Sequence, residues 1–496
     1  MHDHGKSDGP VVPATPSNNA ARAVAEAVEE RGPAKGNTTG TTRPGHSAGL
    51  NVQHALERVR RVAMEDKEAR FTALLHHVDV DRLRAAYWAL KPKAAPGVDG
   101  VTWMDYGRDL EDNLQDLHAR VHRGSYRARP SRRAYIPKTD GRLRPLGIAT
   151  LEDKILQRAV VEVLNAVYET DFLGFSHGFR PGRSPHHALD ALAFGITRRK
   201  VGWVLDADIR SFFTTLDHAW LKRFVEHRIA DKRVLRLIEK WVSAGVIEDG
   251  AWTACEEGVP QGASASPLLA NVYLHHVFDL WAHQWRCRHA RGDVILARFA
   301  DDFVAGFERR DDAERFLADL RERFAKFNLE LAADKTRLIQ FGRFAARDRA
   351  ARGQRRPETF QFLGFTHICA LTRNGRFKLQ RVTDKKRLRV KLSAVKTELM
   401  RRRHLPIPDQ GRWLASVVRG HCAYYAVPDN IDALRVFREQ VIWHWYRTLL
   451  RRSQRSGMTW ERIRRLARRW LPTARILHPW PQQRFDARTQ GRSPVR

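Results

Sequence analysis

The sequence predicts a mixed α/β fold of the α+β class, followed by a mostly helical C-terminal region. Apolar runs with the features of buried strands meet acidic residues at two places, 201–208 and 295–307. Longer segments with helical periodicity separate these strands, for example 218–244 and 266–286. Beyond residue 371 the pattern is predominantly helical, so the C-terminal region is expected to be a separate helical part.

Two adjacent aspartates, Asp301 and Asp302, lie between apolar runs at the expected tip of a hairpin. Neighbouring carboxylates in a buried turn repel each other and lose hydration, so a divalent metal is expected to neutralise them. A solvated turn is the alternative for this pair taken alone. The second acidic pair, Asp311 and Asp312, follows two arginines and begins a helical pattern, which indicates the first turn of a helix instead.

A third carboxylate favours the metal interpretation. Residues 201–209 have the pattern of a buried strand, and Asp206 and Asp208 share one of its faces because side chains alternate along a strand. Two-metal nucleotidyl transfer needs carboxylates from separate strands around ions about 3.5–4 Å apart. Asp208, Asp301 and Asp302 meet this requirement, and the cofactor expected there is a pair of Mg²⁺ ions.

Eight sequence blocks resemble, in order, those of the reverse transcriptase/maturase encoded by bacterial group II introns. The resemblance runs from about residue 70 to residue 496. The blocks lie at 95–100, 136–138 with 144–148, 176–184, 208–213, 258–262 with 266–271, 299–303, 334–336 and 360–365. The resemblance implies an RNA-directed DNA polymerase with a right-hand fold, in which fingers and palm precede an α-helical thumb, also called the X or maturase domain.

The same resemblance implies roles at the catalytic centre. Asp208 and Asp301 correspond to metal ligands, with the backbone carbonyl of Ile209 assisting and Asp302 completing the acidic cluster. Lys335 corresponds to a residue that could donate a proton to the departing pyrophosphate. A solvated surface lysine is the alternative for Lys335.

Four further positions correspond to nucleotide-binding residues. Lys138 and Arg144 would hold the incoming triphosphate, and Gln261 would contact the nucleotide. Phe213 occupies the steric-gate position, where a ring fills the space of a ribose 2′-OH and favours dNTPs. The alternatives are a solvated lysine for Lys138 and ordinary core packing for Phe213.

Three positions depart from the family pattern. Phe299 stands where tyrosine is usual, Ala149 where proline is usual, and Thr214 where an acidic residue is common. None of these changes removes a metal ligand. We therefore expect modest effects on nucleotide choice or rate.

The chain is expected to divide into five parts. Its first part is rich in Gly, Pro, Ser, Thr and Ala and has the composition of a disordered tail, although a helix over 51–68 is an alternative. The parts are the tail at 1–60, fingers at 61–185, palm at 186–370, helical thumb or X domain at 371–455, and a basic DNA/RNA-binding extension at 456–496.

The charge of the chain indicates a polyanionic partner. The formal net charge is +32, and residues 371–496 hold 31 Lys and Arg against 8 Asp and Glu, a net +23. Within 461–470 an apolar stripe of Ile463, Leu466 and Trp470 indicates a packed helix. The arginines outside this stripe could contact phosphates or form a solvated face; they are Arg464, Arg465, Arg468 and Arg469.

The expected partners are the intron RNA, an RNA template with its DNA primer, target DNA and dNTPs, and the oligomeric state stays open. The four cysteines lie far apart, so neither a zinc ribbon nor the endonuclease module of many family members is expected. A membrane span is not expected because no apolar run reaches about 18 residues, and the absence of an export signal predicts a cytoplasmic protein.

The predicted function combines intron splicing as a maturase with copying of the intron into DNA during retrohoming. One alternative is a related reverse transcriptase with a CRISPR-linked or phage-defence role. Another is an RNA-binding splicing cofactor without polymerase activity in cells. The blocks at 266–267 and 424–425 favour the intron type, and the three retained aspartates argue against loss of activity.

Overall fold

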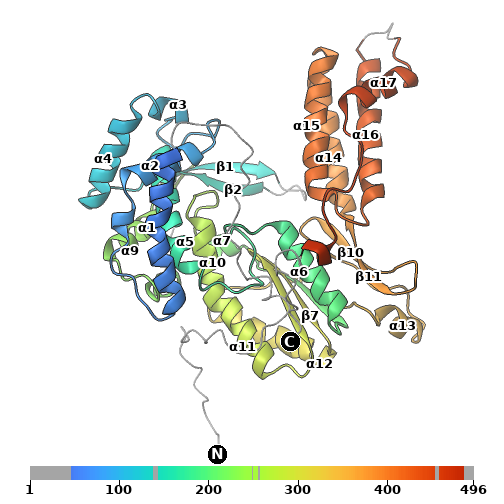
Figure 1. The fold of residues 1–496 in the computed structure, drawn as a ribbon, viewed down its shortest axis with the longest axis horizontal. Helices are drawn as coiled ribbons and strands as arrows, with labels where there is room; N and C mark the ends of the chain where they lie inside the picture. The colour runs from blue at the N-terminus through green and yellow to red at the C-terminus, as the bar shows by residue number, and fades with distance from the viewer. Residues whose placement is uncertain (1–45, 138–142, 249, 255–256, 453–456, 485–496) are drawn as a thin grey trace, which may run out of the picture.

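The computed structural model describes residues 46–137, 143–248, 250–254, 257–452 and 457–484, with residues 46–55 described by their backbone alone. Helices and sheets are mixed, and a helical bundle follows them, which confirms the predicted fold class. Figure 1 shows the three parts of a right-hand arrangement around a central sheet: an N-terminal group of helices, the sheet with its covering helices, and the C-terminal bundle.

The N-terminal part consists of helices packed on one another beside a small sheet. Its sheet has the strand order β2-β1-β4-β5, so strands from two distant segments meet in it. Helix α1 continues through residue 60, where the tail was expected to end, so a helix does form within the 51–68 segment. The elements are α1 (His46–Glu65), α2 (Val80–Ala89), α3 (Trp103–Tyr106), α4 (Leu110–His122), β1 (Ser131–Pro137), β2 (Leu143–Ile148), α5 (Leu151–Tyr168), β4 (Val246–Glu248) and β5 (Ala251–Thr253).

The central sheet is antiparallel, with the strand order β6-β7-β3-β8. The predicted hairpin is present, because β6 and β7 pair directly on either side of the adjacent aspartates. Strand β3 pairs with β7 so that Asp208 lies opposite Asp302. The strands are β3 (Trp203–Asp208), β6 (Val294–Phe299), β7 (Asp302–Phe307) and β8 (Arg337–Gln340).

Each face of this sheet belongs to a different hydrophobic core. Leu205 and Phe303 pack with the helices of the larger cluster, whereas Val204 and Val304 pack with α6 and the second sheet. The helices of this middle part of the chain are α6 (Pro185–Arg198), α7 (Phe212–Thr215), α8 (His218–Glu226), α9 (Lys232–Val242), α10 (Ser266–Leu274), α11 (Leu280–Arg288), α12 (Arg310–Ala325) and α13 (Ala345–Ala350).

Two of the expected helical segments differ in detail from the sequence pattern. The segment 218–244 forms two helices, because Asp231 caps α9 by accepting from the backbone of Arg233 and Val234 and also binds the backbone of Leu74 and Leu75. The segment 266–286 contains a π-helical turn between α10 and α11. In the 218–244 segment, Asp231 accepts hydrogen bonds from four backbone N–H groups and so interrupts a helical periodicity that looked continuous in the sequence.

The helical region begins later than expected. Residues 371–384 are not helical, because β10 and β11 form a hairpin whose turn contains Gly375 at φ +71°. This hairpin and β9 make a three-stranded sheet, and the helices start at Lys385. The elements are β9 (Phe360–Phe362), β10 (Phe365–Leu371), β11 (Phe377–Thr383), α14 (Lys385–Arg401), α15 (Ile407–Tyr425), α16 (Ile431–Leu450) and α17 (Trp460–Trp470).

The C-terminal helices form a bundle with its own core, in which Trp445 and Phe437 are fully buried. Helices α14, α15 and α16 stand side by side, and α17 lies at the end of the bundle that is farthest from the central sheet (Figure 1). Asn430, between α15 and α16, exchanges hydrogen bonds with Thr383 at the end of β11. This contact fixes the base of the bundle to the second sheet.

The chain after α17 returns to the central part of the molecule. The N–H groups of Leu477 and His478 donate to the carbonyl of Ala426 at the base of the bundle. The His478 ring stacks on His186 of α6 with 3.9 Å between centroids, and Arg484 lies 3.1 Å from Asp190 of the same helix. The described end of the basic extension thus links the bundle to the central sheet, a role that the sequence did not indicate.

Candidate active site on the central sheet

Three side chains form a row across the central sheet. Phe299 lies opposite Asp302 in the β6–β7 pair, and Asp302 lies opposite Asp208 in the β7–β3 pair. Directly opposed residues of antiparallel strands project from the same face, so these three side chains are neighbours on one surface. Asp206 shares the face of Asp208 and lies opposite Arg337 of β8, whose guanidinium is 3.5 Å away.

Asp301 lies in the two-residue turn between β6 and β7. The other turn residue, Ala300, has φ +59°, a conformation that is uncommon for a residue with a Cβ atom. The guanidinium of Arg298, which is fully buried, donates to the Ala300 carbonyl at 3.0 Å and to both carboxylate oxygens of Asp279. The same guanidinium donates to Asn271 and Ser176. The fully buried ion pair between Arg298 and Asp279 therefore stabilises the turn that carries Asp301.

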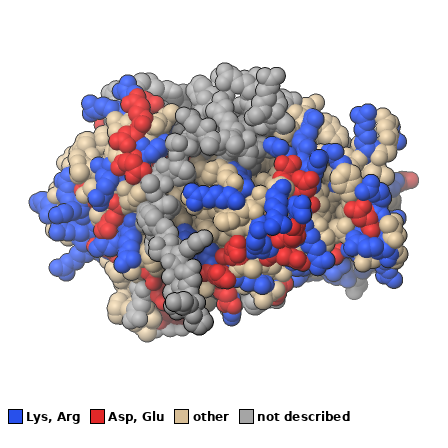
Figure 2. All heavy atoms as spheres, turned by 90° about the horizontal axis from the view of Figure 1, so that it is seen from below, with Lys and Arg blue, Asp and Glu red and all other residues tan. Residues whose placement is uncertain are grey.

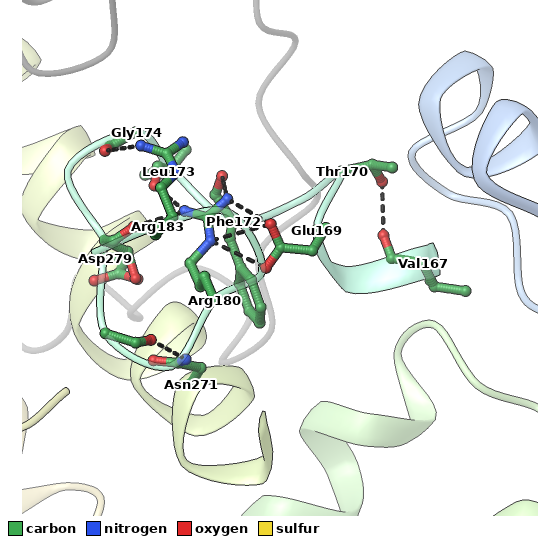
Figure 3. A network of polar contacts seen from close by, with 12 residues as sticks. Val167, Glu169, Thr170, Phe172, Leu173, Gly174, Arg180, Arg183, Asn271 and Asp279 are labelled. Carbon is green, nitrogen blue, oxygen red and sulfur yellow. Dashed lines mark hydrogen bonds and ion pairs between the residues drawn. The ribbon is translucent and has the colours of Figure 1, made fainter. Parts of the chain in front are cut away.

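The loop between α5 and α6 supports the same turn, and Figure 3 shows its polar contacts. Arg180 is buried, pairs with Glu169 at 3.1 Å, and donates to the carbonyls of Leu173 and Ser176 at 2.7 Å. Gly178 lies so close to the hairpin tip that a Cβ atom there would be 2.3 Å from the Ala300 nitrogen. The block at 176–184 thus has a structural role that its sequence alone did not reveal.

The aspartates at this end of the sheet lie close enough together for their negative charges to repel one another. Burial raises the pKa of Asp302 well above its usual value, and the charges of Asp206, Asp208 and Asp301 raise it further. Burial also raises the pKa of Asp301, the charge of Asp208 adds to this shift, and Arg144 and Lys335 oppose it. Clustered carboxylates with raised pKa values are typical of sites that gain stability from a cation.

The three carboxylates at this end of the sheet, which we call the carboxylate row, suit Mg²⁺ in their chemistry. Asp208, Asp301 and Asp302 offer carboxylate oxygens from two adjacent strands and the turn between β6 and β7, and oxygen ligands are those that Mg²⁺ prefers. Within the described ranges no three His, Cys, Asp or Glu side chains are arranged as a complete ligand set. Asp208 instead forms an ion pair with Lys335. The donor types fit the metal, and Asp208 would have to exchange its lysine partner for it.

Ile209 follows Asp208 in the chain, and Lys335 forms an ion pair with the Asp208 carboxylate. Ile209 is buried and forms a bridge with Leu331, in which the Asp208 carbonyl accepts from Ala332 at 2.9 Å. The Arg210 N–H makes the second bond of this bridge, so the Ile209 carbonyl takes no part in its hydrogen bonds. Burial lowers the pKa of Lys335, but the hydrogen bond and charge of Asp208 outweigh it and the net shift is upward.

The expected nucleotide-binding residues lie on elements that surround this row. Arg144 is exposed on β2, and its charge opposes the upward shift that burial causes in the pKa of Asp301. The Gln261 carbonyl accepts from the N–H of Gly147 at 2.7 Å, which fixes its loop to β2, and Gly262 in that loop has φ +110°. Lys138 lies outside the described residues, so its placement stays a prediction.

Phe213 follows the end of β3 on the short helix α7. Its carbonyl accepts from the Val259 N–H at 2.8 Å, which brings the helix against the loop that holds Gln261. The Phe213 ring is half-buried and lies 5.4 Å from the ring of Phe212. The ring thus packs in part against the core and keeps an accessible part, so core packing and a gate are compatible.

The four arginines of α17 are far from the carboxylates, at the distal end of the bundle (Figure 1). All four are exposed, as predicted; they are Arg464, Arg465, Arg468 and Arg469. The packed side of the helix contains buried Ile463 and Ala467 with half-buried Leu466 and Trp470. Ala467 was not part of the predicted stripe, but it faces the bundle because it is four residues from Ile463.

Basic residues do not form a continuous patch on the face shown in Figure 2. Figure 2 shows the underside of the molecule, where Lys and Arg are interspersed with Asp and Glu. Along α12, Arg310 pairs with Glu314 at 2.8 Å and Arg315 pairs with Asp312 at 3.0 Å.

Two further residues, Asp206 and Arg387, lie near the carboxylates. Burial raises the pKa of Asp206 to about 6, against the opposing charge of Arg337. Arg387 of α14 lowers the pKa of Asp302 and lines a pocket between α14 and α15 together with Lys391, His421 and Tyr425. The alternation along β3 had already placed Asp206 on the face of Asp208, whereas Arg387 comes from a distant helix, had no local signal and was missed.

The remaining expectations concern cysteines and membranes. Cys287, Cys369 and Cys422 are free thiols, and Cys255 lies outside the described residues. No helix in the described part of the chain combines the length and apolar character needed to cross a bilayer.

Comparison with known proteins agrees with this geometry. Residues 136–367 match the family model of reverse transcriptase (RNA-dependent DNA polymerase). Protein YkfC of Escherichia coli K12 is 42% identical over 251 residues, which cover 44% of this chain and 66% of that protein. The group II intron-encoded protein LtrA of Lactococcus lactis is 34% identical over 226 residues, which cover 45% of this chain and 37% of LtrA.

A more distant relative is the nuclear intron maturase 1 of Arabidopsis thaliana, 26% identical over 88 residues that cover 18% of this chain and 12% of that protein. The chain thus spans just under two thirds of YkfC and little more than a third of LtrA. The matched family region contains the row of carboxylates and the hairpin that carries it. Residues 136–367 thus match a reverse transcriptase domain, and the chain is similar to a protein encoded by a group II intron.

Proposed function

We propose that this chain is an RNA-directed DNA polymerase that extends a DNA primer on an RNA template with dNTPs. The observation that carries the proposal is the group of three carboxylates at one end of the central sheet, Asp208 and Asp302 on paired strands and Asp301 in the adjoining turn, inside a reverse transcriptase domain. Burial and the repulsion of neighbouring carboxylates raise the pKa values of Asp301 and Asp302, so a bound cation would stabilise their charged forms.

Asp208, Asp301 and Asp302 are the residues that would hold two Mg²⁺ ions, with the Ile209 carbonyl assisting. When bound, the ions activate the primer 3′ hydroxyl and neutralise charge on the leaving pyrophosphate. The ion pair between Lys335 and Asp208 keeps the lysine protonated next to the reacting groups. Lys335 can then move toward the pyrophosphate and donate a proton to it.

The surrounding residues select and orient the nucleotide. Arg144, which is exposed on β2 and whose charge acts on Asp301, supplies positive charge for the triphosphate, and Lys138 adds a second positive charge. Gln261 contacts the nucleotide from a loop that is fixed to the same strand. The accessible part of the Phe213 ring excludes a ribose 2′-OH and so favours dNTPs.

The helical bundle adds RNA binding to polymerisation. We propose that the chain binds its parent intron RNA as a splicing maturase and copies it into DNA at a target site during retrohoming. Support comes from the net +23 beyond residue 371, from the exposed arginines of α17, and from relatives named as intron-encoded proteins and an intron maturase.

The direct test is extension of a DNA primer annealed to an RNA template by the purified chain. We expect dNTP-dependent extension that needs Mg²⁺ and stops when the metal is chelated. A parallel assay measures splicing of the parent intron RNA with and without the protein. Splicing enhancement without any extension would contradict polymerase activity and favour a splicing cofactor, whereas extension without enhancement would contradict the maturase role.

A further inference from the structure

Phe179 is an exposed aromatic residue in an unfavourable backbone conformation beside the carboxylate row. Its φ is +59°, which is rare for a bulky residue, and 55% of its surface is exposed. A strained backbone persists where the surrounding structure enforces it, and such residues cluster at functional sites. Glycine would adopt this conformation without strain, so the conformation itself does not account for a phenylalanine here.

The segment before Phe179 extends the central sheet at its β6 edge. The Arg298 N–H donates to the Phe175 carbonyl at 2.8 Å, and the His177 N–H donates to the Arg298 carbonyl at 2.9 Å. Gly178 then lies directly against Ala300 of the hairpin turn. Residues 175–178 therefore run beside β6 as a short additional strand would.

The Phe179 ring continues the row of side chains on the catalytic surface. Its centroid lies 6.3 Å from the centroid of Phe299, which neighbours Asp302 across the β6–β7 pair. Neighbouring strands are about 4.8 Å apart, so the ring is roughly 10 Å, or two strand spacings, from Asp302. A nucleic-acid duplex rises about 3.4 Å per base pair, so this span is about three base pairs.

The backbone around Phe179 is fixed by buried contacts. The Asn271 side chain donates to the Gly178 carbonyl at 2.7 Å, and the adjacent Arg180 is held by Glu169 and the Leu173 carbonyl (Figure 3). Both arms of the turn are therefore anchored in the protein interior while the Phe179 ring remains in solvent. The arrangement presents an apolar ring rigidly at a fixed distance from the reacting atoms.

We propose that the Phe179 ring, next to Phe299, contacts the sugar and base surface of the primer–template duplex within about three base pairs of the primer 3′ end. The inference rests on the proposed polymerase function. Phe179 is then a substrate-contacting residue that positions the primer end over the carboxylates, because the ring becomes buried when the duplex binds. The strain at φ +59° is kept because the ring must stand at this point of the surface.

The first test compares Phe179→Gly with wild type. Glycine relieves the positive φ, so the variant is expected to unfold at the same temperature as wild type or higher. Loss of the exposed half of a phenyl contact is expected to weaken primer–template binding about fivefold. The KM for dNTP at saturating duplex should not change. Phe344→Ala is the matched control, because Phe344 is 38% exposed and follows β8, the strand at the opposite edge of the sheet from residues 175–178.

The second test does not depend on stability. A benzophenone amino acid is placed at residue 179, and a second preparation carries it at residue 344. After illumination with a defined primer–template, the residue-179 probe should label nucleotides within three base pairs of the primer 3′ end, and the control should not.

The outcomes separate this proposal from the polymerase assignment. If wild type extends primers but Phe179→Gly binds duplex with unchanged affinity, or if the probe labels protein or distant nucleotides, the contact is refuted and the polymerase assignment stands. If wild type does not extend primers at all, the polymerase assignment fails, whatever the probe labels.

Discussion

Replacing Arg298 by methionine tests whether a buried ion pair holds the turn that carries Asp301. Arg298 and Asp279 are both fully buried, and the guanidinium also donates to Asn271, Ser176 and the Ala300 carbonyl. Methionine keeps most of the apolar stem but leaves the Asp279 carboxylate buried without a cation. Breaking a buried pair from one side costs about 3–5 kcal/mol, so we expect the free energy of unfolding to fall by about this amount.

The loss is expected to depend on pH. Burial already raises the pKa of Asp279, and the charge of Arg298 opposes that shift. Without Arg298 the pKa of folded Asp279 rises further above its value in the unfolded chain. A raised pKa in the folded state gives stability that is present below the unfolded pKa and is lost as pH rises through the folded pKa. The difference from wild type should therefore be largest at neutral pH and shrink toward about pH 4.

The measurement is urea unfolding followed by circular dichroism at pH 7 and at pH 5. Arg310→Met is the matched control, because Arg310 and Glu314 form an exposed pair, whose loss is expected to cost less than about 1 kcal/mol. Adding Asp279→Asn to Arg298→Met should recover part of the loss by removing the buried charge. A loss below about 1 kcal/mol in Arg298→Met, or an equal loss at both pH values, would refute the reasoning.

Three further changes test other parts of the structure. Phe213→Ala should raise ribonucleotide incorporation relative to dNTPs by about tenfold or more, measured as the ratio of kcat/KM values, and an unchanged ratio in an active enzyme would place the gate elsewhere. Replacing the four exposed arginines of α17 by glutamine should weaken intron RNA binding and lower its salt dependence by up to about one unit of slope per lost contact, while extension of a pre-annealed primer changes less; unchanged affinity and slope would make this face merely solvated. Burial lowers the pKa of His186 to about 4 and also lowers the pKa of His478, and Asp190, Arg381 and Arg484 face this pair of rings. The docked end of the chain should therefore be fully stable above about pH 6.5 and lose stability as pH falls. Proteolysis within 471–484 should accelerate from pH 7 to pH 5, and a constant rate would contradict this.

The acidic hairpin could be predicted because its signal is local. Alternation along a strand places Asp206 and Asp208 on one face, and an acidic pair between apolar runs indicates a hairpin tip. The direct pairing of Asp208 with Asp302 could not be derived in this way, since register depends on contacts between strands far apart in the sequence. Lys138 lies outside the described residues, so its role in nucleotide binding stays a prediction.

The supporting residues were missed for the same physical reason. Arg298 and Arg180 look like surface arginines in a very basic sequence, yet both are buried because their partners, Asp279 and Glu169, come from other segments. The start of the helical region was placed too early because the β10–β11 hairpin is short and precedes a strongly helical pattern. Docking of Arg484 on Asp190 joins residues nearly 300 positions apart and has no sequence signature.

The central claim is that the carboxylate row performs metal-dependent DNA synthesis on an RNA template. Its most direct test is the single-turnover rate of primer extension by Asp301→Ala with saturating RNA template, DNA primer, dNTPs and Mg²⁺. Asp311→Ala is the control, since Asp311 belongs to the other acidic pair and is exposed at the start of α12. We predict a rate at least about a hundredfold below wild type for Asp301→Ala, with unchanged duplex affinity, and a wild-type rate for the control. A rate for Asp301→Ala within tenfold of wild type would contradict the account.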